Sequence, residues 1–168
     1  GDLLRYTGAQ PRPIASSLAT RLVDLNGDGV RDLVVTDYYT TEPLWPERVP
    51  QSWSPFLCYP GIEDGKALLF GNAVRLRYRD KPDAPAQFFI GGYMHCDVAD
   101  LNGDGLPDLA FAAADKSSEA SKVPDVAGFI HIYLNSGQCD AGGMPVFVFN
   151  GRVERPKGNW GPVRIVDL

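Results

Sequence analysis

The chain of 168 residues lacks most features by which membrane, nucleic-acid-binding and catalytic proteins are usually identified. No apolar run approaches the roughly 20 residues that a membrane-spanning helix requires, so we expect no membrane span. The 16 Lys and Arg are outnumbered by 21 Asp and Glu, which argues against nucleic acid as a partner. Phosphate-binding glycine loops and nucleophile motifs are also missing, and the sequence therefore predicts a protein that is not an enzyme.

Cysteine and histidine are scarce as well. The odd number of cysteines allows at most one internal disulfide, and their spacing matches no zinc or redox motif. We expect them to be buried as small apolar side chains; they are Cys58, Cys96 and Cys139. His95 and His131 have no catalytic partner pattern. Because His131 alternates with Ile130 and Ile132, we expect it on the more exposed face of a strand.

Helical periodicity is nearly absent, and only residues 115–122 form a weak helix candidate. Gly (18) and Pro (14) are frequent enough to indicate many turns between short strands. Turns are predicted at residues 135–137 and at Asn150-Gly151. The sequence thus predicts an all-β fold, with strands at residues 18–23, 33–35, 56–59, 74–78, 109–112, 128–134 and 146–149.

One segment of the chain is repeated. Residues 21–33 recur as residues 97–109, 76 positions later, and residues 163–168 match the start of a third copy. Four strands in a unit of roughly 70 residues are typical of a β-propeller blade. We therefore expect an incomplete β-propeller with about two four-stranded blades and part of a third. Its parts are the last strand of a preceding blade (1–18), two blades (19–92 and 93–161) and the first strand of a following blade (162–168).

Each repeat contains a loop with oxygen-bearing side chains at alternate positions. Positions 1, 3, 5 and 9 are Asp, Asn, Asp and Asp, the Gly at position 6 permits a sharp turn, and the carbonyl of position 7 can face inward. Such hard oxygen donors suit Ca²⁺, which takes six to eight oxygens. The predicted ligands of two calcium sites are Asp24, Asn26, Asp28, Val30 and Asp32 in one loop, and Asp100, Asn102, Asp104, Leu106 and Asp108 in the other.

Other loop types share part of this pattern. An EF-hand would need a bidentate Glu at position 12, and a dockerin-like module would need an acidic ligand there and a closer repeat, but Val35 and Phe111 occupy that position. Loops rich in Asp, Asn and Gly also form plain turns without any metal. The recurrence of all five ligand and glycine positions favours calcium over plain turns.

Residues 89–109, which contain the motif Asp-Leu-Asn-Gly-Asp-Gly, resemble the FG-GAP/VCBS repeat of integrin α subunits and of many bacterial secreted or surface proteins. The resemblance covers both repeats and the start of the third. It implies a calcium-binding β-propeller, usually of seven blades, in an extracellular, cell-surface or periplasmic location. The chain departs from the family pattern in having Ala at residues 112–114 in place of Gly-Ala-Pro. Such repeats serve in adhesion, in lectin-like binding and beside catalytic domains, so the resemblance implies fold and metal more closely than function.

Two segments are candidates for ligand binding. Residues 38–53 form an inserted loop whose aromatic side chains either make a platform for a sugar or protein partner or pack against the blade edge. These aromatic candidates are Tyr38, Tyr39, Trp45 and Trp53. Arg75, Arg77 and Arg79 alternate along an expected strand and so share one face. They are suited to an anionic glycan or an acidic partner, or they form a solvated strand face.

The sequence as a whole favours a calcium-stabilised, non-catalytic module for binding, adhesion or assembly, with a protein or glycan partner outside the cell. Further blades would come from the same chain or from a neighbouring one. One alternative is the propeller of a secreted polysaccharide lyase or hydrolase, which the aromatic loop and the arginine row would serve. Another is a purely structural subunit of a larger assembly.

Overall fold

The computed structural model describes residues 4–6, 17–37, 56–63, 65, 68–89, 94–113, 129–155 and 164–165. These residues form β-strands and loops without a helix, which confirms the all-β prediction. No helix that could cross a membrane occurs among them. The aromatic loop with Tyr38, Tyr39, Trp45 and Trp53, and the weak helix candidate at residues 115–122, lie outside the described residues.

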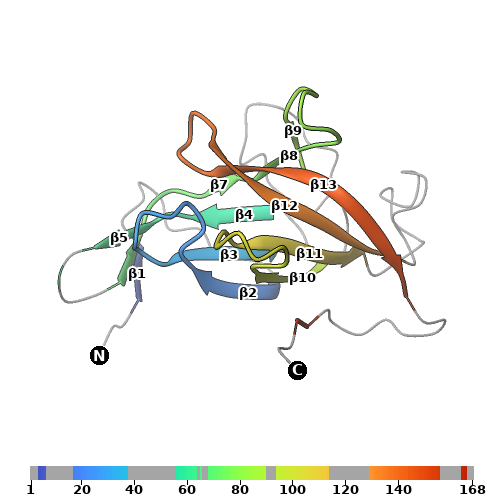
Figure 1. Ribbon diagram of the computed structural model, residues 1–168. Helices are drawn as coiled ribbons and strands as arrows, with labels where there is room; N and C mark the ends of the chain where they lie inside the picture. Colours follow the sequence, from blue (N-terminus) through green and yellow to red (C-terminus); the bar gives the residue numbers. More distant parts are fainter. Residues whose placement is uncertain are drawn as a thin grey trace.

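The strands form three sheets, none of which closes on itself (Figure 1). The first sheet is antiparallel, in the order β2 (Ser17–Val23), β3 (Asp32–Asp37), β4 (Phe56–Tyr59) and β7 (Val74–Arg75). The second has the order β10 (Met94–Ala99), β11 (Asp108–Ala113), β12 (Phe129–Cys139), β13 (Pro145–Glu154), β8 (Arg77–Arg79) and β9 (Gln87–Phe88). The third is small and consists of β1 (Leu4–Tyr6), β6 (Leu68–Phe70) and β5 (Gly61–Glu63).

The first three strands of the two large sheets correspond position by position. Val34 pairs with Cys58 between β3 and β4, and Ala110 pairs with Ile132 between β11 and β12. The sequence repeat is therefore also a structural repeat of three antiparallel strands. The last strands differ, because β8 and β9 from the end of the first repeat join the outer edge of the second sheet.

Both turns predicted in the second repeat are wrong, because β12 and β13 continue through them. The register between these strands shifts at Ile132/Tyr133, so Asn150 is accommodated as a bulge, and Gly151 beside it has a φ of 135°. A second shift absorbs residues 136–138. The chain reverses only at residues 140–143, where Asp140 Oδ1 accepts a hydrogen bond from the N–H of Gly142.

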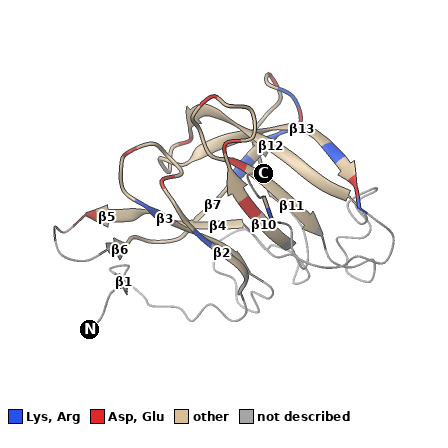
Figure 2. Cartoon of the chain, turned by 60° about the horizontal axis from the view of Figure 1, so that its bottom comes forward, with Lys and Arg blue, Asp and Glu red and all other residues tan. Residues whose placement is uncertain are grey.

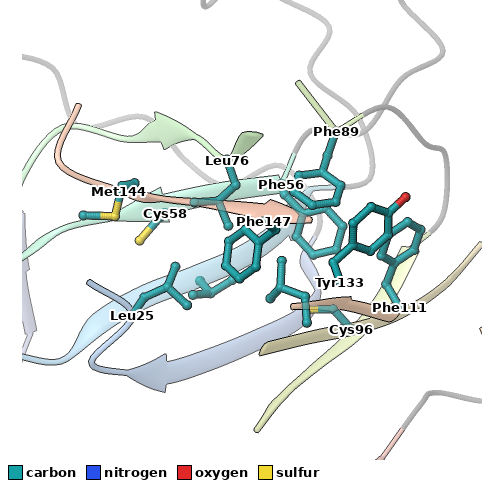
Figure 3. Close-up of a cluster of buried hydrophobic side chains, with 12 residues drawn as sticks. Leu25, Phe56, Cys58, Leu76, Phe89, Cys96, Phe111, Tyr133, Met144 and Phe147 are labelled. Atoms are coloured by element: carbon teal, nitrogen blue, oxygen red, sulfur yellow. The ribbon is translucent and has the colours of Figure 1, made fainter. Parts of the chain in front are cut away.

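The main core lies between the two large sheets and is rich in aromatic rings (Figure 3). Phe89 is at its centre, with ring centroids within 4.7–6.1 Å of those of five other residues: Phe56, Tyr78, Phe111, Tyr133 and Phe147. Both repeats contribute these rings, so the core holds the two sheets together.

His131 belongs to this core, and the prediction of an exposed position is wrong. The residue is 8% exposed, and its ring stacks on Phe111 at 5.3 Å with an interplanar angle of 10°. The strand alternation was assigned correctly, but the apolar Ile130 and Ile132 lie on the opposite face, which has a smaller cluster of its own.

The cysteines divide into two kinds. Cys58 and Cys96 are buried free thiols, as predicted, whereas Cys139 is an exposed free thiol, so its predicted burial is wrong. Cys139 is the last residue of β12, next to the hairpin tip. Burial raises the pKa of Cys96 to about 12, with the nearby Arg21 opposing the shift.

Candidate functional site: two repeated acidic loops

The loops joining β2 to β3 and β10 to β11 project on the same side of the molecule, with their acidic residues in red in Figure 2. In the first loop, Asp24 Oδ1 accepts hydrogen bonds from the N–H groups of Gly27 (2.8 Å) and Asp28 (3.1 Å), and Oδ2 accepts one from Gly29 (2.8 Å). In the second, Asp100 makes the same three contacts at 2.7, 3.2 and 2.8 Å. These hydrogen bonds hold the pKa of Asp100 below its ordinary value.

The side chains at positions 3 and 5 contact each other in both loops. Asn26 Nδ2 donates to Asp28 Oδ2 at 2.9 Å, and Asp28 Oδ1 accepts the N–H of Val30 at 2.8 Å. Asn102, Asp104 and Leu106 repeat this arrangement at 2.8 Å in each case. Because positions 1, 3 and 5 all bond to the backbone of positions 4 to 7, their oxygens are gathered within a single turn.

Two glycines in each loop have left-handed backbone conformations that other residues adopt only with strain. Their φ angles are 78° at Gly27 and 88° at Gly29, and 79° and 86° at Gly103 and Gly105. The close agreement between the loops means that one backbone conformation is specified twice by the same residue pattern.

The acid at position 9 is buried at the base of each loop. Asp32 is 0% exposed, and its two oxygens accept the N–H groups of Leu25 (2.9 Å) and Gly61 (2.8 Å). Burial raises its pKa; the two hydrogen bonds oppose the shift, whereas the negative charges of Asp28 and Asp24 add to it. Asp32 thus links the loop to Gly61, in the strand that follows β4. It also lies close enough to Asp24 and Asp28 for their charges to act on its pKa.

Asp108 occupies the same position in the second loop. It is 0% exposed, and its oxygens accept the N–H groups of Leu101 (2.9 Å) and Asn135 (2.7 Å). Its pKa is raised by burial and by the charges of Asp104 and Asp100, against the effect of the two hydrogen bonds. The buried acids of the two loops therefore have the same kinds of partner and the same direction of pKa shift.

The sequence did not reveal the partners of these buried acids. Gly61 has no room for a side chain, because a Cβ there would overlap the carbonyl oxygen of Arg31. Asn135, predicted to be a turn residue, also donates from Nδ2 to the carbonyls of Leu25 (3.4 Å) and Pro107 (3.3 Å), which links the first loop to the second. An alignment of β4 with β12 would have placed Gly61 and Asn135 at equivalent positions.

The donor set of each loop suits a hard cation. All the side-chain donors are oxygens, and in each loop the negative charges of two carboxylates add to the raised pKa of the third, buried one, a repulsion that a bound Ca²⁺ would relieve. Within the part of the chain that the structure describes, no three acidic, His or Cys side chains are close enough to hold a metal ion as they stand. A cation would have to compete with backbone N–H groups for these oxygens.

The arginine row expected on one strand is split between two sheets, so that prediction is wrong. Leu76 is 1% exposed, and its burial in the core separates β7 from β8. Arg75 and Arg77 still converge, with guanidinium carbons 4.0 and 4.2 Å from the centre of the Phe88 ring. Arg79 instead donates to the carbonyl of Pro82.

The two repeats are also joined through equivalent positions of their first strands. Arg21 Nε donates to Asp97 Oδ1 at 2.5 Å, and Asp97, 76 residues after Arg21, stands at the same place in β10. Asp97 Oδ2 accepts the N–H of Ile165, at the start of the third copy, at 2.7 Å. Burial raises the pKa of Asp97, but the hydrogen bonds from Arg21 and Ile165 outweigh that effect, and the pKa lies below its ordinary value.

Comparison of this chain with family models, with curated proteins and with solved structures finds no match. The resemblance to FG-GAP/VCBS repeats therefore stays a prediction from the motif, and the function has to be argued from the geometry of the loops and sheets.

Proposed function

We propose that the chain forms calcium-binding blades of a β-propeller and acts as a non-catalytic binding or assembly module outside the cell. The observation that carries this proposal is the near-identity of the two acidic loops. They share their hydrogen bonds, the conformations of their glycines and a buried aspartate at position 9. A single turn rich in Asp and Asn needs no explanation beyond its own hydrogen bonds. Two turns that keep the same oxygens, including exposed ones at positions 3 and 5, favour a shared ligand.

The stacking of the sheets supports the propeller. Val34 and Cys58 of the first sheet belong to the core facing the second sheet, and their equivalents Ala110 and Ile132 lie on the face of the second sheet that points away from that core. Ile165 of the third copy packs on this second face. The first repeat therefore packs against the second with the same face that the second repeat uses to contact the third copy. This arrangement is expected for successive blades in a ring.

In this proposal Asp24, Asn26, Asp28 and Asp32, with the carbonyl of Val30, hold one Ca²⁺, and the corresponding residues from Asp100 to Asp108 hold another. The ion would supply a positive charge that neutralises the crowded carboxylates and ties the loop together. The chain's own contribution is to preorganise the loop by its glycines and its backbone hydrogen bonds. Extracellular modules bind Ca²⁺ with dissociation constants of about 10⁻⁴–10⁻³ M.

Thermal unfolding with CaCl₂, with MgCl₂ and with EDTA tests this function. At a hundredfold excess over the dissociation constant, each site adds about 2.7 kcal/mol to the free energy of unfolding. For a chain of this size that raises the Tm by roughly 5–10 °C per site. The Asp28→Asn and Asp104→Asn double variant should lose the response, whereas Asp83→Asn, an exposed acid between β8 and β9, should keep it. A Tm that is the same in CaCl₂ and EDTA contradicts the proposal and leaves the loops as plain turns.

A double-mutant cycle on Arg21 and Asp97 tests the stacking of the two repeats. Their side chains are 21% and 11% exposed, and a charged hydrogen bond in such a place is worth about 1.5–3 kcal/mol. We expect Arg21→Gln, Asp97→Asn and the double variant to give a coupling energy of about 1–2 kcal/mol in urea unfolding at pH 7. Because the folded-state pKa of Asp97 is lowered, this contribution is present above the ordinary value of 3.8 and shrinks as the pH falls below it. Additive single effects at pH 7 would show that the pair does not couple the sheets.

A further inference from the structure

A small pocket of about 300 Å³ lies where the first sheet meets the second. It is lined by Val74 and Arg75 of β7, Arg77 of β8, Phe88 of β9 and two residues of the β12–β13 hairpin tip, Asp140 and Gly142. Figure 1 shows this hairpin tip beside β7. A Cβ on Gly142 would come within 3.0 Å of Val74 Cγ1, so the hairpin and β7 approach closely at the pocket.

The polar side of the pocket is dominated by two guanidinium groups that lie over the Phe88 ring, at 4.0 Å for Arg75 and 4.2 Å for Arg77. Contact with an aromatic face restrains a guanidinium group in position. Arg75 is only 7% exposed, whereas the side chain of Arg77 is 39% exposed and open to a ligand. The pocket is thus built around two arginines that both contact the Phe88 ring.

Among the described lining residues, the acid beside these two cations is Asp140. Asp140 Oδ2 lies 3.5 Å from Arg77 Nε, and Asp140 Oδ1 is held by the N–H groups of Gly142 (2.8 Å) and Met144 (3.4 Å). The hairpin turn therefore fixes this carboxylate at the long end of ion-pair distance from Arg77. Among the residues that the structure describes, the lining has two cationic side chains and one acidic side chain beside the apolar surfaces of Val74 and Phe88.

We propose that this pocket binds a sugar that bears a carboxylate, as in a uronic acid residue of a glycan. An arginine fork matches a carboxylate in two parallel hydrogen bonds, and the apolar wall suits the C–H face of a sugar ring. The volume lies at the lower end of small-molecule sites, about 300 Å³, and leaves room for one ring. An acidic peptide of several residues would extend beyond a pocket of this size. The proposal rests on the proposed function in taking the chain to be a binding module.

Titration of the full chain with D-glucuronate, with D-glucose as the neutral counterpart, tests the pocket by NMR. We expect saturable shifts at residues 73–77 and 140–142 with glucuronate and none with glucose. Arg77→Gln should weaken glucuronate binding at least tenfold, and Gly142→Ala should weaken it by narrowing the pocket. The matched control is Arg152→Gln, which removes the same charge from another Arg–Phe contact, Arg152 over Phe129 at 4.2 Å, and should leave binding unchanged.

Three outcomes would overturn the assignment: glucose binding as tightly as glucuronate, equal weakening by Arg77→Gln and Arg152→Gln, or tighter binding of triglutamate than of glucuronate. Repeating the titration in CaCl₂ and in EDTA separates the pocket proposal from the proposal that the acidic loops bind calcium. Absence of glucuronate binding in a chain whose Tm responds to calcium overturns only the pocket. Glucuronate binding in a chain whose Tm does not respond to calcium overturns only the calcium proposal.

Discussion

Replacement of Asp32 or Asp108 by Asn should lower the free energy of unfolding by about 2–3 kcal/mol even when no calcium is present. Each acid is fully buried, and each of its oxygens accepts a backbone N–H. An amide offers one oxygen and one NH₂ group, so one buried N–H would face another donor. Loss of the buried negative charge relieves the desolvation that raises the pKa of both acids, which offsets part of the cost.

Urea unfolding in EDTA measures this effect without any contribution from a bound cation. The matched control is Asp28→Asn, which changes an acid of the same loop whose contacts are exposed to water. Water can replace those contacts, so little change is expected in EDTA. Equal stability of the Asp32→Asn and Asp28→Asn variants would contradict the proposal that the buried Asp32 carboxylate stabilises the loop.

Replacement of Phe89 by Ala should be the most destabilising change in the core, at about 3–5 kcal/mol. Phe89 is 2% exposed and contacts rings from both repeats (Figure 3). Removal of its ring leaves a cavity that the neighbouring strands can fill only by shifting toward it from their present positions. The free energy of unfolding in urea is the measurement.

The conservative variant Phe89→Leu separates lost volume from lost aromatic contacts and should cost clearly less than Phe89→Ala. Val153→Ala, on a residue that is 58% exposed, serves as the surface control and should change stability by about 0.5 kcal/mol or less. A cost of Phe89→Ala no greater than that of Val153→Ala would show that the two sheets do not share one core.

The all-β fold could be predicted because short apolar runs between turn residues carry their signal locally. Three of the strands around the loops, β2, β3 and β11, were placed within one or two residues, since the repeated motif marks where β2 ends and where β3 and β11 begin. The loop conformation was equally accessible, because Gly27 and Gly29 have left-handed φ angles that few other residues tolerate.

Other features depend on contacts between distant segments and left no local signal. The continuation of β13 through Asn150-Gly151 depends on a register shift opposite Ile132, and the break between β7 and β8 depends on the burial of Leu76. The hydrogen bond from Asn135 to Asp108 joins residues 27 positions apart. The dipeptide Asn150-Gly151 by itself predicts a turn. Its pairing with β12 keeps it in a strand instead.

A calcium titration by isothermal calorimetry, on the parent chain and on each single-loop variant, tests the central claim most directly. The account predicts two bound Ca²⁺ per chain for the parent, and one each for Asp28→Asn and for Asp104→Asn, with Asp83→Asn retaining two. No calcium-dependent heat in the parent, or two ions bound by either single-loop variant, would contradict the assignment of the repeated acidic loops as calcium sites.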